Sequence, residues 1–123
     1  MKLVIVGTGA MGRVLRDCAM EEGTFKTVYM VEPLEGNWPE EKPDLLIDFS
    51  HPEAIGTIYE YCWRMGGNIP VVLATTGYKQ EHELMIGLLE KICQYSFQLV
   101  QHIHSSQNGQ NLTFIVYHKK KAL

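Results

Sequence analysis

The opening stretch of the chain, KLVIVGTGAMGRVL, constrains its fold more than any other feature. A short apolar run, residues 2–6, is followed by the glycine pattern G-x-G-x-x-G and then by residues with helical spacing. This order is typical of a strand, a tight turn and a helix in a βαβ unit. It predicts an α/β domain with a parallel sheet.

Each glycine of the pattern has a physical role. Gly7 allows a tight turn, a side chain at Gly9 would occupy the space of a pyrophosphate, and Gly12 allows close packing of helix on strand. Free N–H groups at the start of the helix attract phosphate. The alternative is a tight turn that binds nothing. The predicted dinucleotide cradle comprises Gly7, Thr8, Gly9, Ala10, Met11, Gly12 and Arg13.

The second apolar run ends at Glu32, about 20 residues after the last glycine of the pattern. A carboxylate there can accept hydrogen bonds from the adenosine ribose hydroxyls and repels a 2′-phosphate. Pro33 follows it, rather than Arg or Lys, although Arg13 or Lys26 could still reach such a phosphate. We therefore expect NAD (NADH) to be preferred over NADP (NADPH).

Short apolar runs alternate with helical patterns along the rest of the chain, which predicts a Rossmann-type dinucleotide-binding domain. The expected strands are residues 2–6, 27–32, 44–49, 70–75 and 97–103. The expected helices are residues 10–22, a segment that follows Ser50, and residues 80–93. Residues 33–43 contain three prolines and no periodicity, so we expect a surface loop there.

Local signals define the ends and faces of these helices. Ser50 and Glu53 have the spacing of a capping box around Pro52, and Gly66 with Gly67 supplies a stop. Gly23 ends the first helix, whose Leu15, Cys18 and Ala19 are spaced to face the sheet. In the last helix the expected apolar stripe is Leu84, Leu88 and Ile92.

Composition narrows the class of protein. The chain has 123 residues, 46% of them hydrophobic and 20% charged, which suits one globular domain. A net charge of −3 argues against a nucleic-acid partner, and residues 119–121 are interpreted as a solvated basic tail. The first apolar run is too short for a signal peptide or a membrane span. We expect a cytoplasmic protein.

Cysteine and histidine patterns do not favour a metal or disulfide protein. Cys18, Cys62 and Cys93 are widely spaced and odd in number, which suits reduced thiols on buried helix faces. His102 and His104 would share one face of a strand as two metal ligands do, but no third ligand is evident. An exposed strand face is the preferred interpretation, and no metal is expected.

Two further stretches carry a family resemblance. LLIDFSHPEA, residues 45–54, and VVLATTGY, residues 71–78, each end an apolar strand with small polar residues, where open α/β sheets bind ligands. Together with GTGAMGR, they resemble the 4-hydroxy-tetrahydrodipicolinate reductase family over residues 1 to about 95. The resemblance implies that Phe49 and Ser50 line the middle of the cofactor, and that Thr75, Thr76 and Gly77 lie by the nicotinamide.

The same resemblance implies an NAD(P)H-dependent enzyme of lysine and diaminopimelate biosynthesis. The family's catalytic segment, a His-His pair followed by Lys and a later Ser-Gly-Thr, has no counterpart among these residues, so no catalytic residue is assigned. We expect residues 1–95 to be the dinucleotide-binding domain and residues 96–123 to be the last strand with a divergent remnant of the link to a substrate domain.

A dinucleotide-binding domain of this kind, without a substrate domain, is expected to bind cofactor but to catalyse no turnover on its own. The alternatives are a non-catalytic nucleotide-binding module, and the Rossmann half of another dehydrogenase such as diaminopimelate or aspartate-semialdehyde dehydrogenase.

The final apolar run, LTFIVY at residues 112–117, would lie at or beyond the fifth strand with no partner in the chain. An unpaired β-prone edge is a template for association. We therefore expect a homodimer or other self-association through residues 96–118. In the alternative, the run folds back as a sixth strand or a helix and leaves a monomer.

Overall fold

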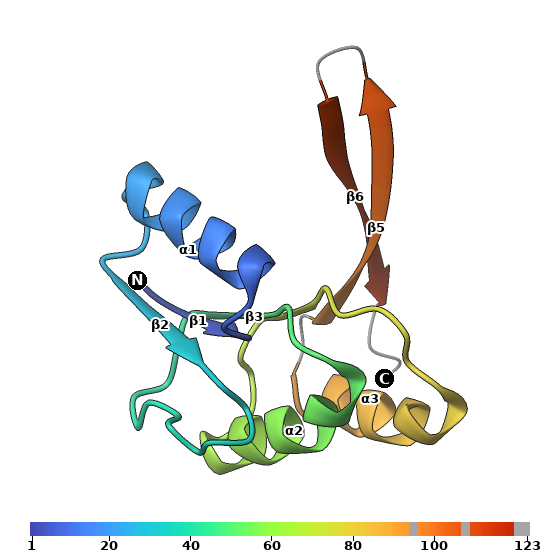
Figure 1. Ribbon diagram of the computed structural model, residues 1–123. Coiled ribbons are helices and arrows are strands. Elements are labelled where there is room, and N and C mark those ends of the chain that lie inside the picture. Colours follow the sequence, from blue (N-terminus) through green and yellow to red (C-terminus); the bar gives the residue numbers. More distant parts are fainter. Residues whose placement is uncertain (94–95, 107–108, 120–123) are drawn as a thin grey trace.

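The structure is a computed structural model that describes residues 1–93, together with the backbone of residues 96–106 and 109–119. It is an α/β domain built on one sheet with the strand order β2-β1-β3-β4-β5-β6 (Figure 1). The strands are β1 Lys2–Val6, β2 Thr27–Val31, β3 Leu45–Asp48, β4 Val71–Leu73, β5 Ser96–Ser106 and β6 Gly109–Lys119. The helices are α1 Ala10–Glu22, the 3-10 turn η1 Pro52–Ala54, α2 Ile55–Arg64 and α3 Gln80–Ile92.

The first five strands are parallel, which confirms the predicted Rossmann-type architecture. β1 has β2 on one side and β3 on the other, so the strand order reverses between β1 and β3. Ligands of open α/β sheets bind outside the carboxyl ends of the strands at such a reversal. Here those ends are Val6 and Asp48, directly before Gly7 and Phe49.

Two layers of helices enclose the sheet unequally. α2 and α3 lie on one side of it and α1 on the other (Figure 1). The α2 and α3 side has a continuous core that includes Leu46, Ile58, Ile69 and Leu89, each fully buried. On the α1 side the buried cluster is small. It comprises Leu3, Ile5 and Ala19.

Helix ends lie where the sequence signals place them. α1 ends at Gly23, whose φ of 82° is the left-handed conformation that favours glycine. Gly67 has a φ of 71°, and a Cβ there would lie 2.6 Å from the carbonyl oxygen of Ile92, so the stop after α2 also packs against the end of α3. Residues 33–43 form neither a helix nor a strand, as predicted.

The buried face of α3 differs from the predicted stripe. His82, Ile86 and Leu89 are buried, whereas Leu84 is 72% exposed. The physical reason is the inward position of His82, whose Nδ1 accepts the Lys79 N–H at 2.9 Å. The contact of His82 Nε2 with Glu53 of η1, at 3.1 Å, then sets the rotation of the helix, so positions four and seven residues later face the core.

The capping box expected at Ser50 is wrong. The chain enters η1 through His51 without a side-chain cap, and α2 begins only at Ile55. Ser50 donates its hydroxyl to the carboxylate of Asp48 instead. Glu53 pairs with His82 Nε2 at 3.1 Å, which links η1 to α3.

The burial of the cysteines also differs from expectation. Cys62 and Cys93 are buried, but Cys18 is exposed because α1 covers only part of its side of the sheet. Among the described residues, helices of the length and hydrophobicity needed to cross a membrane do not occur.

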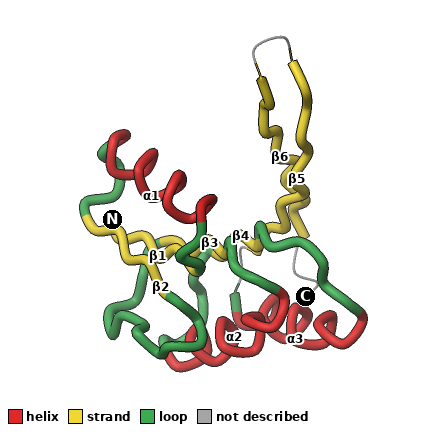
Figure 2. Tube along the Cα trace, viewed as in Figure 1, coloured by secondary structure: helices red, strands yellow, loops and turns green. Residues whose placement is uncertain are grey.

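The expectation that residues 112–117 lack a partner in the chain is wrong, because they lie in β6, which pairs antiparallel with β5 along its length. Within the described part of the chain, β5 pairs with β4 through Ser96, Phe97 and Gln98, and beyond them with β6. The resulting hairpin projects away from the rest of the sheet (Figure 2). The final apolar run therefore forms a sixth strand.

Candidate functional site

The glycine turn joins β1 to α1 at the point where the strand order reverses. Gly7 has a φ of +118°, and its N–H donates to the carbonyl of Val31 at 2.8 Å. A Cβ at Gly7 would lie 2.3 Å from the carbonyl oxygen of Phe49, and one at Gly12 would lie 2.5 Å from that of Gly7. Both positions therefore require glycine for close backbone approach. Gly12 brings α1 against the turn itself, with Met30 of β2 nearby.

Gly9 is different, because its conformation is one that any residue adopts. Its φ is −78°, and a Cβ there would meet no atom of the described residues within 4 Å. It directly precedes α1, whose first turn has no side-chain cap. The first intrahelical bond is donated by Arg13, so the N–H groups of residues 10–12 remain available at the start of the helix. An open space thus faces uncapped amides and the positive end of a helix dipole.

Glu32 lies beside this turn. The hydroxyl of Thr8 is 3.5 Å from one carboxylate oxygen of Glu32, and the N–H of Leu34 is 3.4 Å from the other. Arg13 is exposed on the first turn of α1. Lys26 precedes the opposite, amino-terminal end of β2, so it cannot reach a phosphate near Glu32.

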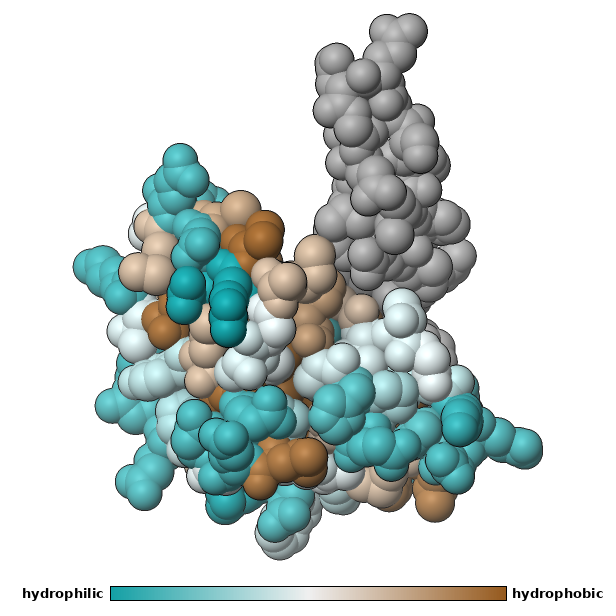
Figure 3. Space-filling view, in the orientation of Figure 1, coloured by the Kyte–Doolittle hydropathy of each residue, from teal (hydrophilic) through white to brown (hydrophobic). Residues whose placement is uncertain are grey.

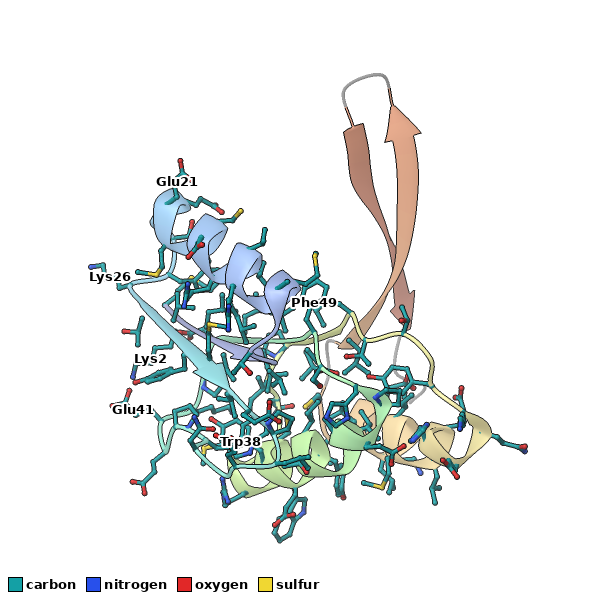
Figure 4. All side chains as sticks on the ribbon, in the orientation of Figure 1. Lys2, Glu21, Lys26, Trp38, Glu41 and Phe49 are labelled. Atoms are coloured by element: carbon teal, nitrogen blue, oxygen red, sulfur yellow. The ribbon has the colours of Figure 1, made fainter. Side chains whose placement is uncertain are left out.

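An apolar groove continues from the turn toward β3. It has a volume of about 170 Å³ and is lined by Met11, Val14, Leu15, Cys18 and Phe49. Figure 4 shows Phe49 beside the amino-terminal end of α1, and Figure 3 shows the hydrophobic surface that accompanies α1. Met11 and Phe49, predicted from separate motifs, are therefore brought together.

The ends of β3 and β4 form the other part of the site. Thr75 is buried and lies close to Ser50, whose N–H its hydroxyl accepts at 3.0 Å. Thr76 and Gly77 are exposed in the loop before α3. Gly77 has a φ of +87° and faces Pro52, where a Cβ would be 3.8 Å from the proline ring. The two family motifs therefore meet at one edge of the sheet.

Sequence reasoning missed Asp48, the last residue of β3. Its side chain is fully buried and accepts hydrogen bonds from Ser50, Thr75 and Tyr78. Burial raises the pKa of Asp48, and these hydrogen bonds oppose the rise. The available signal was an acidic residue at the end of an apolar strand, followed two residues later by a serine.

A second missed feature anchors the loop of residues 33–43. Trp38 stacks on Tyr61 of α2 with ring centroids 4.5 Å apart, and the Tyr61 hydroxyl donates to the carbonyl of Pro39 at 3.0 Å. Burial raises the pKa of Tyr61 to about 12. An adjoining cavity of about 220 Å³ is lined by this loop and α2. The loop is thereby fixed beside Glu32.

Metal binding has little support among the described side chains. Glu53, Glu81 and His82 lie close enough to share an ion. However, Nδ1 of His82 accepts a backbone N–H, so Nε2 carries the proton and donates it to Glu53. That pattern describes a structural histidine. His102 and His104 lie in β5, where only the backbone is described.

Comparison with known proteins gives a consistent family. Residues 1–102 match the family described as dihydrodipicolinate reductase, N-terminus. A 4-hydroxy-tetrahydrodipicolinate reductase of Brachyspira hyodysenteriae is 34% identical over 80 residues, 65% of this chain and 32% of that protein. One from Alkaliphilus metalliredigens is 32% identical over 84 residues, 67% of this chain and 34% of that protein.

The chain therefore spans about a third of the length of these curated relatives. Their shared name and the match over residues 1–102 favour the reductase over the other dehydrogenases considered. The chain belongs to the family of the dihydrodipicolinate reductase N-terminal domain.

Proposed function

We propose that this chain is the NAD(P)H-binding half of a 4-hydroxy-tetrahydrodipicolinate reductase, acting in the cytoplasm in lysine and diaminopimelate biosynthesis. The observation that carries the proposal is the space at Gly9. A Cβ there would meet no described atom within 4 Å, although the flanking glycines are tightly packed. The space opens onto the uncapped start of α1 at the reversal of strand order.

The residues present fit a dinucleotide along this edge of the sheet. The turn of residues 7–13 would hold the pyrophosphate through backbone N–H groups, and Glu32 would accept bonds from the adenosine ribose. Phe49 and Ser50 would lie near the middle of the cofactor, with Thr75, Thr76 and Gly77 by the nicotinamide. When bound, nicotinamide supplies the hydride, and the chain binds and orients it.

Glu32 supports a preference for NADH over NADPH. Its carboxylate lies beside Thr8 of the turn, and Lys26, one of the two cations that could favour a 2′-phosphate, is at the far end of β2. A 2′-phosphate would meet like charge at Glu32.

We further propose that these 123 residues bind cofactor but reduce no dihydrodipicolinate-type substrate alone. The relatives are about three times as long as the matched segment, and the histidine and lysine motif expected for substrate has no counterpart here. We propose the boundary between the dinucleotide-binding domain and the remnant of the link at residue 95.

We also propose that the chain self-associates through residues 96–118. β6 is paired, but it forms the edge of the sheet and is 11 residues long. Beyond Gln98 the ribbon has two strands, an arrangement that is marginally stable without further packing. Light scattering of the full chain and of a form that ends at Gln94, over a micromolar concentration series, tests this. A monomeric full chain contradicts it, as does a shortened form that still dimerises.

Two measurements test the main proposal. Fluorescence titration with NADH should show saturable binding, and an NADH oxidation assay with substrate should show no turnover above a blank. Absence of NADH binding would contradict the proposed function. Binding accompanied by substrate-dependent turnover would mean that residues of this chain supply the catalytic groups.

A further inference from the structure

A buried carboxylate lies directly beneath the cofactor edge of the sheet. Asp48 ends β3, its side chain is 0% exposed, and no ion pair to it occurs among the described residues. Burial of a carboxylate without an ion pair is costly, so its oxygens must accept hydrogen bonds.

The donors to Asp48 come from three successive parts of the site. Oδ1 accepts the N–H of Ser50 at 3.1 Å and also its hydroxyl. Oδ2 accepts the hydroxyl of Thr75 at 2.8 Å and that of Tyr78 at 3.2 Å. The backbone carbonyl of Asp48 accepts the N–H of Ala74 at 2.9 Å. One residue therefore joins the end of β3, the end of β4 and the loop before α3.

We propose that Asp48 is a positioning residue for the nicotinamide end of the cofactor site. The inference rests on the proposed function, because it assigns Asp48 the task of holding the groups that would face the nicotinamide. Asp48 itself, being fully buried, would not touch the cofactor.

The direction of the hydroxyls supports this role. Ser50 and Thr75 both donate their hydroxyls inward to Asp48. The exposed part of the edge is then Thr76 and Gly77. Their location relative to β3 is set by Asp48 through Thr75 on one side and Tyr78 on the other. Small displacements of such groups reduce the fit to a ligand strongly.

The hydrogen bonds to Asp48 do not extend to the adenosine end of the site. Glu32 and Thr8 make no hydrogen bond to Asp48, Ser50, Thr75 or Tyr78 among the described residues. The effect of losing Asp48 should therefore depend on which half of the cofactor is used as the probe.

The test compares NADH with ADP-ribose, which lacks the nicotinamide, on the full chain. Asp48→Asn keeps the shape but replaces one acceptor oxygen by an NH₂ donor. We expect NADH affinity to fall about tenfold and ADP-ribose affinity by less than about twofold. The emission spectrum of bound NADH, which reports the surroundings of the nicotinamide, should also change.

Paired variants separate positioning from general loss of stability. Thr75→Val removes the hydroxyl bond to Asp48 at matched shape, and Thr75→Ser retains it. We expect Thr75→Val to weaken binding of NADH but not of ADP-ribose, and Thr75→Ser to bind NADH as the wild type does. This pair keeps the inference testable if Asp48→Asn does not fold. Cys62→Ala, a buried change on α2, should lower stability and leave the ratio of the two affinities unchanged.

Equal weakening of NADH and ADP-ribose, or no change in either, would overturn the positioning role. Failure of the wild-type chain to bind NADH would instead overturn the proposed function, and the inference with it. Selective loss of NADH in Asp48→Asn and Thr75→Val, with rescue by Thr75→Ser, is the expected result.

Discussion

The two ends of the candidate cofactor site are built in opposite ways. The end near β1 and β2 is a glycine turn with uncapped amides, and its one carboxylate, Glu32, is only half-buried. The end near β3 and β4 is a network of side chains whose centre, Asp48, is fully buried. The first end presents its polar groups outward, and the second directs them inward.

This difference indicates that the two ends contribute to cofactor binding in different ways. Outward-facing amides and a carboxylate can contribute affinity and cofactor choice directly. Groups already paired with one another contribute through the position of the backbone that they hold. Gly7 connects the two ends, because its backbone lies against the carbonyl of Phe49.

Substitution of that connecting glycine should have the largest effect. In Gly7→Ala the Cβ would lie 2.3 Å from the Phe49 carbonyl oxygen, at a φ of +118°. We expect a loss of unfolding free energy of about 3 kcal/mol from the clash and the strained backbone. Urea denaturation measures it. Gly9→Ala is the control, and equal stability of the two variants would contradict the close approach.

The next largest effect should be on affinity at the glycine turn. Gly9→Val places its side chain in the open space and should weaken NADH and ADP-ribose alike by at least about 100-fold, or ~2.7 kcal/mol. Circular dichroism should show an intact fold. Gly87→Val is the matched control, since a Cβ there also meets none of the atoms that the structure describes within 4 Å, but Gly87 lies in α3. Normal cofactor binding by Gly9→Val would mean that the glycine motif is only a turn and does not hold the cofactor.

Cofactor choice should change by a smaller amount. Glu32→Arg exchanges repulsion for attraction at a 2′-phosphate, so the ratio of NADH to NADPH affinity should narrow or invert, by about tenfold. Parallel titrations with both cofactors measure the ratio. If both proteins bind the two cofactors equally well, Glu32 lies outside the site.

The smallest expected effect is a pH dependence specific to the inward-facing end. Burial raises the pKa of Asp48 above its ordinary value of 3.8, so the folded protein binds this proton more tightly than the unfolded chain does. Its contribution to unfolding free energy is fully present below that ordinary value and is lost as pH rises through the raised pKa.

Asp48→Asn removes this titration. The stability of the wild type relative to Asp48→Asn should therefore fall as pH rises from below 3.8, because contributions of the other carboxylates cancel in the difference. Urea denaturation of both proteins across this range measures the difference. A difference that stays constant, or that grows with pH, would mean that Asp48 is not penalised by burial.

Local sequence signals were sufficient for β1 and α1. The apolar run, the glycine pattern and Gly23 are all contiguous, and both elements have the predicted bounds. The same signals identified the turn as a place where the backbone is closely packed, since they depend on conformation rather than on distant partners.

Local sequence signals predict wrongly where the structure depends on distant residues. Ser50 has the local pattern of a helix cap, but its hydroxyl bonds to Asp48, whose carboxylate is oriented by Thr75 and Tyr78 far along the chain. The rotation of α3 likewise depends on His82 and its contact with Glu53. Such choices follow from tertiary packing, which overrides local preference.

Backbone amide shifts of the labelled chain, followed by NMR during titration, test the central claim most directly. With NADH we expect changes at residues 7–13, Glu32, Ser50 and residues 75–77. With ADP-ribose, which lacks only the nicotinamide, we expect them at residues 7–13, Glu32 and Ser50, but not at residues 75–77. The absence of shifts with NADH, or shifts confined to residues outside the glycine turn and the ends of β3 and β4, would contradict the assignment of this edge as the cofactor site.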